Sequence, residues 1–343
     1  MSETGEFAMR ISPEPRGSGS RGGCSRGARW GRRGEIARLP VSAEAKAFLI
    51  GNRAARIPVP LTPLTARIIR RVYNRKRVPI VELEARFGVE ASTGTAGGVE
   101  VCTMVPRGGR GADRYAIYLH GGAYLVGDAR DDLAVLMAEA LGFPLVSIQY
   151  RLSPEAAFPA ALDDALAAYT ATIEQRGTKF VLIGLSAGGG LALALMQRVR
   201  ELGLPQPAGL GLLTPWTDLA RVGTSYHSLE GKDPLIRWRR QLDKAARAYA
   251  AGQDMSDPLL SPVHAPDLSG FPPSMITTGT RDLFMSNCVR MYWALRAAEA
   301  PTHLRVWEGM WHSFCDQPDI PEAAECRDEV AAFLRRALDD AAG

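Results

Sequence analysis

The sequence predicts an α/β fold in which a mostly parallel central sheet is covered by helices on both faces. From residue 115 onward, short continuous apolar runs alternate with longer stretches of helical periodicity. This alternation is typical of parallel strands that are buried on both faces. The chain has 343 residues, of which 46% are hydrophobic, which is enough for one large domain, either alone or with a small accessory piece.

The apolar runs give the order of the expected elements. Strands are expected at 115–119, 144–150, 180–185, 210–215, 274–279 and 304–309. Helices are expected at 159–177, 188–203, 286–300 and 322–338. Before residue 115, two alternating segments, 81–91 and 98–106, predict antiparallel strands at one sheet edge, joined by the turn-rich stretch 92–98.

The chain before the sheet divides into a polar tail and two amphipathic segments. Residues 1–38 contain eight Arg, four Glu and few aliphatic residues, so we expect a disordered tail. Residues 39–78 are expected to form two cap helices, and residues 79–343 the main α/β domain. The rhythm of strands and helices stops after the strand at 210–215, which predicts an insertion at about 217–255 that completes the cap.

Composition argues against several classes of function. The tail accounts for the formal net charge of +4, and the remainder, with 33 basic and 33 acidic residues, gives no sign of nucleic-acid binding. No run of about 18 apolar residues predicts a membrane span, and the tail lacks a secretory signal, so we expect a cytoplasmic protein. Five cysteines without C-x-x-C spacing indicate a reducing compartment and no metal site.

The stretch GLSAGGG, residues 184–190, places Ser186 between an apolar strand and an apolar helix. It fits the pattern G-x-S-x-G, in which glycines permit a tight strand-to-helix turn that exposes the serine hydroxyl. The helix N-terminus favours negative charge at this point. A phosphate loop would need a lysine after its last glycine, and a dinucleotide turn would need glycine at position 186. We therefore predict that Ser186 is a nucleophile.

A general base for Ser186 should follow it in the chain, on a loop after a strand. His312 meets both conditions because it comes directly after the strand 304–309. The other histidines precede the serine, lie in the insertion or begin a strand; they are His120, His227, His264 and His303. Cys315 lies three residues from His312 and is an alternative nucleophile, but its setting is poorer than that of Ser186.

The acid of such a site should lie between the serine and the histidine. Asp282 directly follows the strand 274–279, and we predict that it orients the histidine. Its alternative role is to cap the next helix. Asp218 also follows a strand and is the second candidate, and Asp257 is the third.

The oxyanion of a tetrahedral intermediate needs hydrogen-bond donors fixed in advance. Gly121 and Gly122 follow the strand 115–119, and their amides, with the amide of Ala187, are the expected donors. Three residues near these motifs are candidates for the walls of a substrate pocket, namely Tyr124, Leu185 and Trp216. Packing in the core is the alternative interpretation of the two aromatic residues.

Together these motifs resemble the hormone-sensitive-lipase-like family of α/β-hydrolases, which are bacterial esterases with a helical cap. HGGAYLVGD is similar to the family's H-G-G-G motif, YRLSPEAAFPAALDDALAAY to its Y-R-L-A-P-E block, and GLSAGGGLAL to its G-D-S-A-G-G elbow. TPWTDL, SDPLLSP, GTRDLF and GMWHSF match later blocks, so the resemblance covers residues 40–340.

The resemblance implies the α/β-hydrolase fold, with residues 79–343 as the catalytic domain. It implies a triad of Ser186, Asp282 and His312, with oxyanion donors at Gly121, Gly122 and Ala187. It also implies hydrolysis of short- to medium-chain carboxylic esters, no cofactor, and a possible homodimer. Alternatives are a lactone or amide hydrolase with the same triad, or a non-catalytic small-molecule receptor.

The chain departs from the family pattern at two positions. Ala123 stands where the family has the last glycine of its oxyanion motif. Leu185 stands before the nucleophile, where the family usually has Asp, and it removes a charge and hydrogen-bond acceptors from the base of the triad. We expect Leu185 to alter the rate and the pH profile but not the class of reaction.

Overall fold

The structure, a computed structural model, describes residues 34–74, 79–109 and 113–341. The chain divides into two compact units, residues 1–38 and residues 39–343. Most of the expected disordered tail lies outside the described residues, so its disorder stays a prediction. In the first unit, the described residues include one short helical turn at 34–37.

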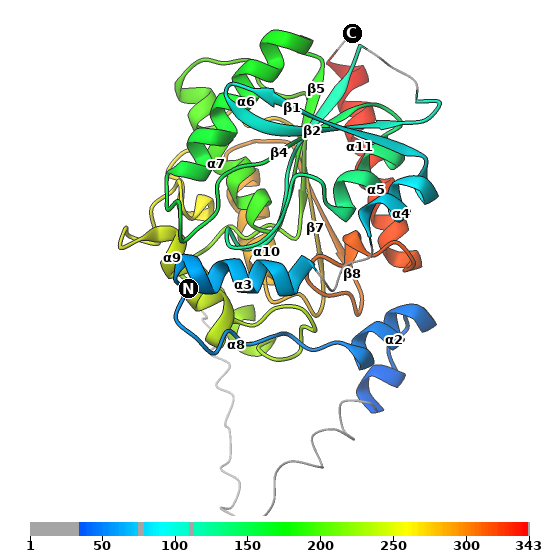
Figure 1. Cartoon of the computed structure of the whole chain (residues 1–343), viewed down its shortest axis with the longest axis vertical. Helices are drawn as coiled ribbons and strands as arrows, with labels where there is room; N and C mark the ends of the chain where they lie inside the picture. The colour runs from blue at the N-terminus through cyan, green and yellow to red at the C-terminus, as the bar shows by residue number, and fades with distance from the viewer. Residues whose placement is uncertain (1–33, 75–78, 110–112, 342–343) are drawn as a thin grey trace, which may run out of the picture. The chain divides into compact units, whose positions relative to one another are not determined.

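An eight-stranded sheet forms the centre of residues 39–343 (Figure 1). Its strands lie in the spatial order β1-β2-β4-β3-β5-β6-β7-β8. Their bounds are β1 Val89–Ala96, β2 Val99–Pro106, β3 Tyr115–Leu119, β4 Leu145–Ile148, β5 Phe180–Leu185, β6 Leu210–Leu213, β7 Ser274–Gly279 and β8 Thr302–Trp307. The pairs β1–β2 and β2–β4 are antiparallel, and the strands from β4 to β8 are parallel. The predicted mostly parallel sheet is therefore confirmed.

Helices cover both faces of this sheet. Their bounds are α2 Ala43–Gly51, α3 Pro63–Asn74, α4 Ile80–Phe87, α5 Asp132–Leu141, α6 Ala160–Arg176, α7 Ala187–Glu201, α8 Ser225–Ser228, α9 Asp243–Ala250, α10 Met285–Ala297 and α11 Pro321–Asp340. The helices α6, α7 and α10 lie on one side of the sheet, and α4, α5 and α11 on the other (Figure 1). This two-sided cover explains why every residue of β3 to β7 is buried.

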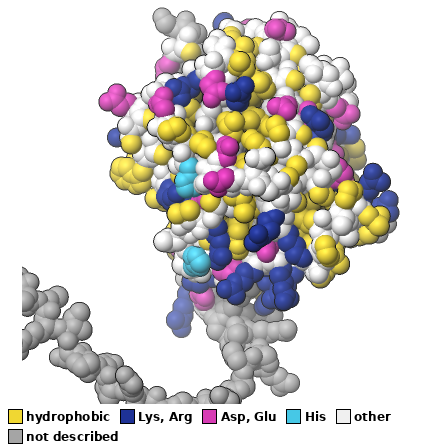
Figure 2. Space-filling model, turned by 90° about the vertical axis from the view of Figure 1, so that its left-hand side faces the viewer, with side chains coloured by type: hydrophobic (Ala, Val, Ile, Leu, Met, Phe, Trp, Pro, Cys, Tyr) yellow, Lys and Arg dark blue, Asp and Glu magenta, His cyan; other side chains and the backbone are white. Residues whose placement is uncertain are grey.

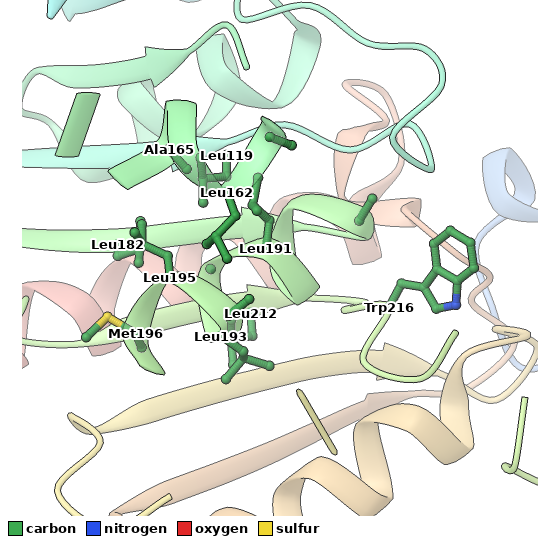
Figure 3. Close-up of a cluster of buried hydrophobic side chains, with 14 of the residues drawn as sticks. Leu119, Leu162, Ala165, Leu182, Leu191, Leu193, Leu195, Met196, Leu212 and Trp216 are labelled. Carbon is green, nitrogen blue, oxygen red and sulfur yellow. The ribbon is translucent and has the colours of Figure 1, made fainter. Parts of the chain in front are cut away.

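The apolar core lies between the sheet and α7. Side chains of β3, β5 and β6 meet leucines of α7 there, as Figure 3 shows for Leu119, Leu182, Leu191 and Leu212. Helix α7 is buried over most of its length because both its sheet face and its outer face are covered. The serine turn at the start of α7 is therefore built on a rigid, fully packed base.

The prediction of a strand at 81–91 was wrong, because α4 occupies most of that segment. Apolar residues at positions 80, 83 and 87 follow helical spacing, and Gly88 ends the helix with φ of 64°. The expected turn at 92–98 lies mostly in β1, an edge strand that pairs with β2 along its whole length. The exposed polar side chains of β1 do not form the apolar pattern that predicts a strand. This strand is stabilised by hydrogen bonds to β2 rather than by burial of its side chains.

The N-terminal segment and the insertion after β6 pack against each other. Ile57, Ala66, Leu125 and Ala245 form one small apolar cluster. The ammonium group of Lys244 in α9 donates to the carbonyl oxygens of Ile57 and Val59, each at 2.8 Å. Within the insertion, non-helical backbone at Arg239 and Arg240 precedes α9.

Positive charge is unevenly distributed over the described residues. Figure 2 shows Lys and Arg side chains gathered near one end of the face that it presents. Four arginines line a cavity of about 400 Å³ with Glu230 and Gly231; they are Arg56, Arg237, Arg239 and Arg240. The carboxylate of Glu230 accepts hydrogen bonds from the amides of residues 238 and 239. Although the formal net charge of residues 39–343 is zero, the insertion therefore has a basic patch on its surface.

Candidate active site

Ser186 lies in the turn between β5 and α7. Its backbone has φ of 55° and ψ of −117°, a conformation that non-glycine residues rarely adopt. The amide of Ser186 donates to the carbonyl of Leu213 in β6 at 2.9 Å, and its own carbonyl accepts from Gly189, Gly190 and Trp216. These main-chain bonds hold the strained residue in place, with its side chain at the carboxyl ends of the strands.

The glycines around Ser186 are required by close backbone contacts. A Cβ atom at Gly184 would overlap the carbonyl of Gly188, and a Cβ atom at Gly188 would overlap the carbonyl oxygen of Leu119. The spacing G-x-S-x-G therefore reflects the tightness of this turn and its closeness to β3.

Gly188→Ala is expected to lower the free energy of unfolding by about 1–3 kcal/mol, because backbone must move to admit the methyl group. Thermal and denaturant unfolding would measure this loss. Gly94→Ala is the matched control, since a Cβ atom at Gly94 meets no atom within 4 Å. Equal stability of the two variants would contradict the steric interpretation.

The structure brings Ser186, His312 and Asp282 together. His312 Nε2 lies 2.7 Å from Ser186 Oγ, and His312 Nδ1 lies 3.1 Å from Asp282 Oδ1. The three residues follow β5, β8 and β7, whose carboxyl ends meet at one edge of the sheet. All three are buried, with exposed fractions of 5%, 3% and 0%. A proton can therefore pass from the hydroxyl to the imidazole without crossing water.

Neighbouring groups fix the carboxylate and the imidazole. Asp282 Oδ2 accepts from the hydroxyl of Thr278, and Oδ1 accepts from the amide of Phe284, both at 2.8 Å. The ring of Phe284 packs edge-on against the His312 ring, with centroids 4.7 Å apart. Asp282 contacts His312, whereas its alternative role as a cap of α10 is not seen, because α10 begins after Phe284 without a side-chain cap.

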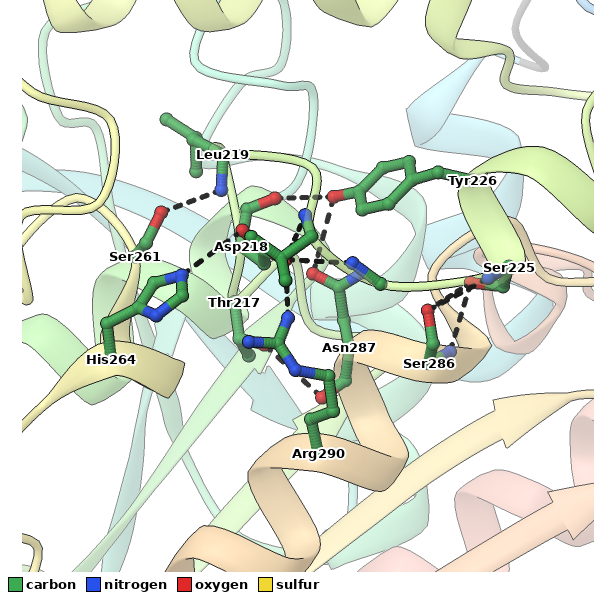
Figure 4. Close-up of polar contacts among 12 residues, drawn as sticks. Thr217, Asp218, Leu219, Ser225, Tyr226, Ser261, His264, Ser286, Asn287 and Arg290 are labelled. Atoms are coloured by element: carbon green, nitrogen blue, oxygen red, sulfur yellow. Dashed lines mark hydrogen bonds and ion pairs between the residues drawn. The ribbon is translucent and has the colours of Figure 1, made fainter.

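Asp218, the second candidate for the acid, lies in a different polar network (Figure 4). Its carboxylate pairs with Arg290, lies 3.5 Å from the ring of His264, and accepts from the amides of Val222 and Gly223. These contacts bind the insertion to α10. Asp257, the third candidate, accepts from the amide of residue 259 in its own loop.

The other candidates from the sequence have separate surroundings. His227 contacts Arg221, His303 packs against Phe333, and His120 stacks on Tyr150 with ring centroids 4.1 Å apart. Cys315 is fully buried, and burial raises the pKa of its thiol well above the usual range. A neutral, enclosed thiol is a poor nucleophile, which agrees with its interpretation as a bystander.

The expected oxyanion donors lie on two sides of Ser186. Gly122 has φ of 115°, and a Cβ atom there would overlap the carbonyl of Val126, so this position needs glycine. Among the described residues, no main-chain carbonyl accepts a hydrogen bond from the amides of Gly121, Gly122 or Ala187.

The three expected pocket residues are almost completely enclosed. Tyr124 stacks on Tyr249 with ring centroids 3.7 Å apart, and the Trp216 indole donates to the Tyr226 hydroxyl at 2.9 Å. These contacts favour core packing for both aromatic residues. Leu185 is 5% exposed, and its side chain lies against Gly121. A Cβ atom added at Gly121 would lie 3.2 Å from the end of the Leu185 side chain.

Asp233 is a residue of this region that the sequence reasoning missed. Its carboxylate is 1% exposed and accepts a hydrogen bond from the amide of His312 at 2.9 Å. Burial raises its pKa to about 6, the neighbouring His312 lowers it, and Asp282 raises it. The only sequence signal was an Asp-Pro pair in the insertion, which ordinarily marks a turn.

Two further features are absent from the described residues, a metal-ion site and a membrane-spanning helix. Within 34–74, 79–109 and 113–341, no three His, Cys, Asp or Glu side chains are grouped so that they could hold a metal ion. In the same part of the chain, every helix is too short or too polar to cross a bilayer.

Comparison with known proteins supports the resemblance found in the sequence. Residues 116–316 match the model of a family with the alpha/beta hydrolase fold. An acetyl-hydrolase of Streptomyces hygroscopicus is 36% identical over 231 residues, which cover 65% of this chain and 76% of that protein. The esterase LipU of Mycobacterium tuberculosis is 31% identical over 237 residues, which cover 66% and 79%.

Solved structures agree with these relatives. The crystal structure of an esterase E25 superposes with a TM-score of 0.78 and 30% identity, covering 95% of this chain and 98% of that one. A hormone-sensitive lipase from a metagenome library superposes with a TM-score of 0.70 and 30% identity, covering 81% and 100%. The chain therefore belongs to the α/β-hydrolase family, in its hormone-sensitive-lipase-like branch, and is a carboxylic ester hydrolase.

Proposed function

We propose that the protein hydrolyses short- to medium-chain carboxylic esters through an acyl-enzyme on Ser186. The observation that carries this proposal is the chain of contacts from Ser186 Oγ to His312 Nε2 and from His312 Nδ1 to Asp282, at 2.7 and 3.1 Å. Both distances allow hydrogen bonds, and the three groups are shielded from water.

In the first half of the reaction, Ser186 Oγ attacks the carbonyl carbon of the ester while His312 Nε2 takes the hydroxyl proton. The amides of Gly121, Gly122 and Ala187 stabilise the oxyanion of the tetrahedral intermediate. Asp282 accepts from Nδ1–H and so keeps the tautomer in which Nε2 is the base. When the bond from carbon to the alcohol oxygen breaks, His312 gives its proton to the alcohol, and the acyl group remains on Ser186.

In the second half, His312 takes a proton from water, and the resulting hydroxide attacks the acyl carbon. The intermediate expels Ser186 Oγ, which recovers its proton from His312. The products are the carboxylic acid, the alcohol and the free enzyme. Atoms and charges balance without a cofactor.

Residues 39–78 and about 217–255 are proposed to form a cap over this site. The apolar cluster of Ile57, Ala66, Leu125 and Ala245 supports this, because it joins both segments to the loop after β3. The Lys244 bonds to the carbonyls of Ile57 and Val59 add polar contacts between the same segments. Such a cap would limit the length of the acyl chain.

A series of p-nitrophenyl esters of increasing acyl length tests the proposed substrate class. Acetyl and butanoyl esters are expected to have kcat/KM values at least about tenfold higher than dodecanoyl esters, since each methylene excluded from a pocket costs up to a few kcal/mol. A lactone and a p-nitroanilide belong in the same panel. Preference for the dodecanoyl ester would overturn the chain-length proposal, and faster turnover of the lactone or anilide would move the reaction to that bond.

A further inference from the structure

Asp233 joins three segments of chain through one buried carboxylate. Oδ1 accepts from the amides of Leu235 and Ile236, at 2.8 and 3.0 Å, and closes a turn within its own segment. Oδ2 is thereby directed elsewhere, and it accepts from the amides of His312 and Leu283, at 2.9 and 3.3 Å. Four main-chain N–H groups thus share one carboxylate that is 1% exposed.

The two distant partners of Asp233 are placed beside the reacting groups. His312 carries the imidazole, and Leu283 directly follows Asp282. The 3.1 Å between His312 Nδ1 and Asp282 Oδ1 depends on how the loop after β8 lies against the loop after β7. Asp233 is an acceptor common to both loops, so its position affects that distance. Each loop also has its own bonds, such as that from the amide of Phe284 to Asp282.

We propose that Asp233 is a positioning residue that holds the loop of His312 against the loop of Asp282 and so keeps the imidazole in reach of Ser186. This proposal rests on the proposed function, since it assigns a role within the same reaction. The insertion would then contribute to catalysis, because it supplies Asp233, whose carboxylate accepts hydrogen bonds from both loops.

The groups facing Asp233 determine when its carboxylate is ionised. They are the imidazole of His312 and the carboxylate of Asp282, while the guanidinium of Arg281 donates to the carbonyl of the adjacent Lys232 at 3.4 Å. Burial raises the pKa of Asp233 to about 6. Above this pH the ionised group accepts four hydrogen bonds. Below it, one oxygen carries a proton and accepts less well, so the two loops are held less firmly.

The test is Asp233→Asn in the full-length protein, with p-nitrophenyl butanoate as substrate. The variant is expected to lower kcat by about 10–100-fold with little change in KM, as for partners that orient a reacting side chain. For the wild type, log(kcat/KM) should fall more steeply than in the variant as the pH drops through about 6, because Asp233 takes up a proton there and the asparagine does not.

Asp218→Asn is the matched control, because Asp218 is also fully buried and also accepts from two amides, but it lies in a network apart from His312. It should lower the melting temperature while leaving kcat and the pH slope near the wild-type values. Equal loss of kcat in both variants, or a wild-type kcat in Asp233→Asn, would overturn the proposal.

Two measurements distinguish failure of the Asp233 positioning role from failure of the proposed ester hydrolysis. If Asp233→Asn does not fold, the wild-type pH profile alone decides, since a log(kcat/KM) that stays level as the pH drops through about 6 would refute a role for the ionised carboxylate. Failure of the wild type to hydrolyse any ester, together with absence of fluorophosphonate labelling at Ser186, would refute the proposed function itself. If the wild type is active and Asp233→Asn keeps the wild-type kcat, only the positioning role is refuted.

Discussion

Ser186→Ala is expected to reduce kcat for short p-nitrophenyl esters by about 10⁵–10⁶-fold, to the level left by the oxyanion donors and binding alone. Without Oγ, no covalent acyl-enzyme can form, and His312 has no hydroxyl to deprotonate. The melting temperature should change little, because alanine and serine experience the same strain at φ of 55°. Steady-state kinetics and thermal unfolding would measure the two effects.

Ser147→Ala provides the control for Ser186→Ala. Ser147 is fully buried in β4, and its hydroxyl has no hydrogen-bond partner among the described residues, so its loss should leave kcat unchanged. A fluorophosphonate should label the wild type and Ser147→Ala but not Ser186→Ala. If Ser186→Ala kept most of its turnover, Ser186 would not be the nucleophile.

Asp282→Asn is expected to lower kcat by roughly 10³–10⁴-fold, because an amide at this position no longer holds the imidazole in the tautomer that leaves Nε2 free. Asp218→Asn should leave kcat near the wild-type value, since its contacts serve packing between the insertion and α10. Kinetics of both variants at saturating substrate would distinguish these expectations. Similar losses, or a larger loss in Asp218→Asn, would transfer the role of the acid.

The parts of the fold that could be predicted from the sequence are those in which a single effect, either burial of apolar side chains or steric strain, restricts the residue types. The strands from β3 to β7 are short, fully buried runs because helices cover both sides, and burial leaves a clear pattern. The serine turn was predictable because its strain leaves few residue types possible at positions 184 and 188. The closeness of the candidate triad residues could be expected, since loops at the carboxyl edge of a parallel sheet converge.

Other features depend on contacts that the sequence does not display. Helix α4 is short, and its alternating polar residues matched a strand pattern equally well. Helix α5, at 132–141, was not predicted at all, although Asp131 caps it by accepting from the amide of Ala134. Asp233 contacts residues 50 and 79 positions away through main-chain amides, which carry no side-chain signature.

The contact between Leu185 and Gly121 has an evolutionary consequence. The Leu185 side chain occupies the space beside Gly121, and a Cβ atom at position 121 would lie only 3.2 Å from it. A residue with a Cβ atom at position 121 would require Leu185 to shift by a few tenths of an ångström, so substitutions at the two positions are expected to be coupled. A change of size at one position alters the selection acting on the other, so relatives with a polar residue before the serine should show a different pattern of tolerated substitutions in this loop.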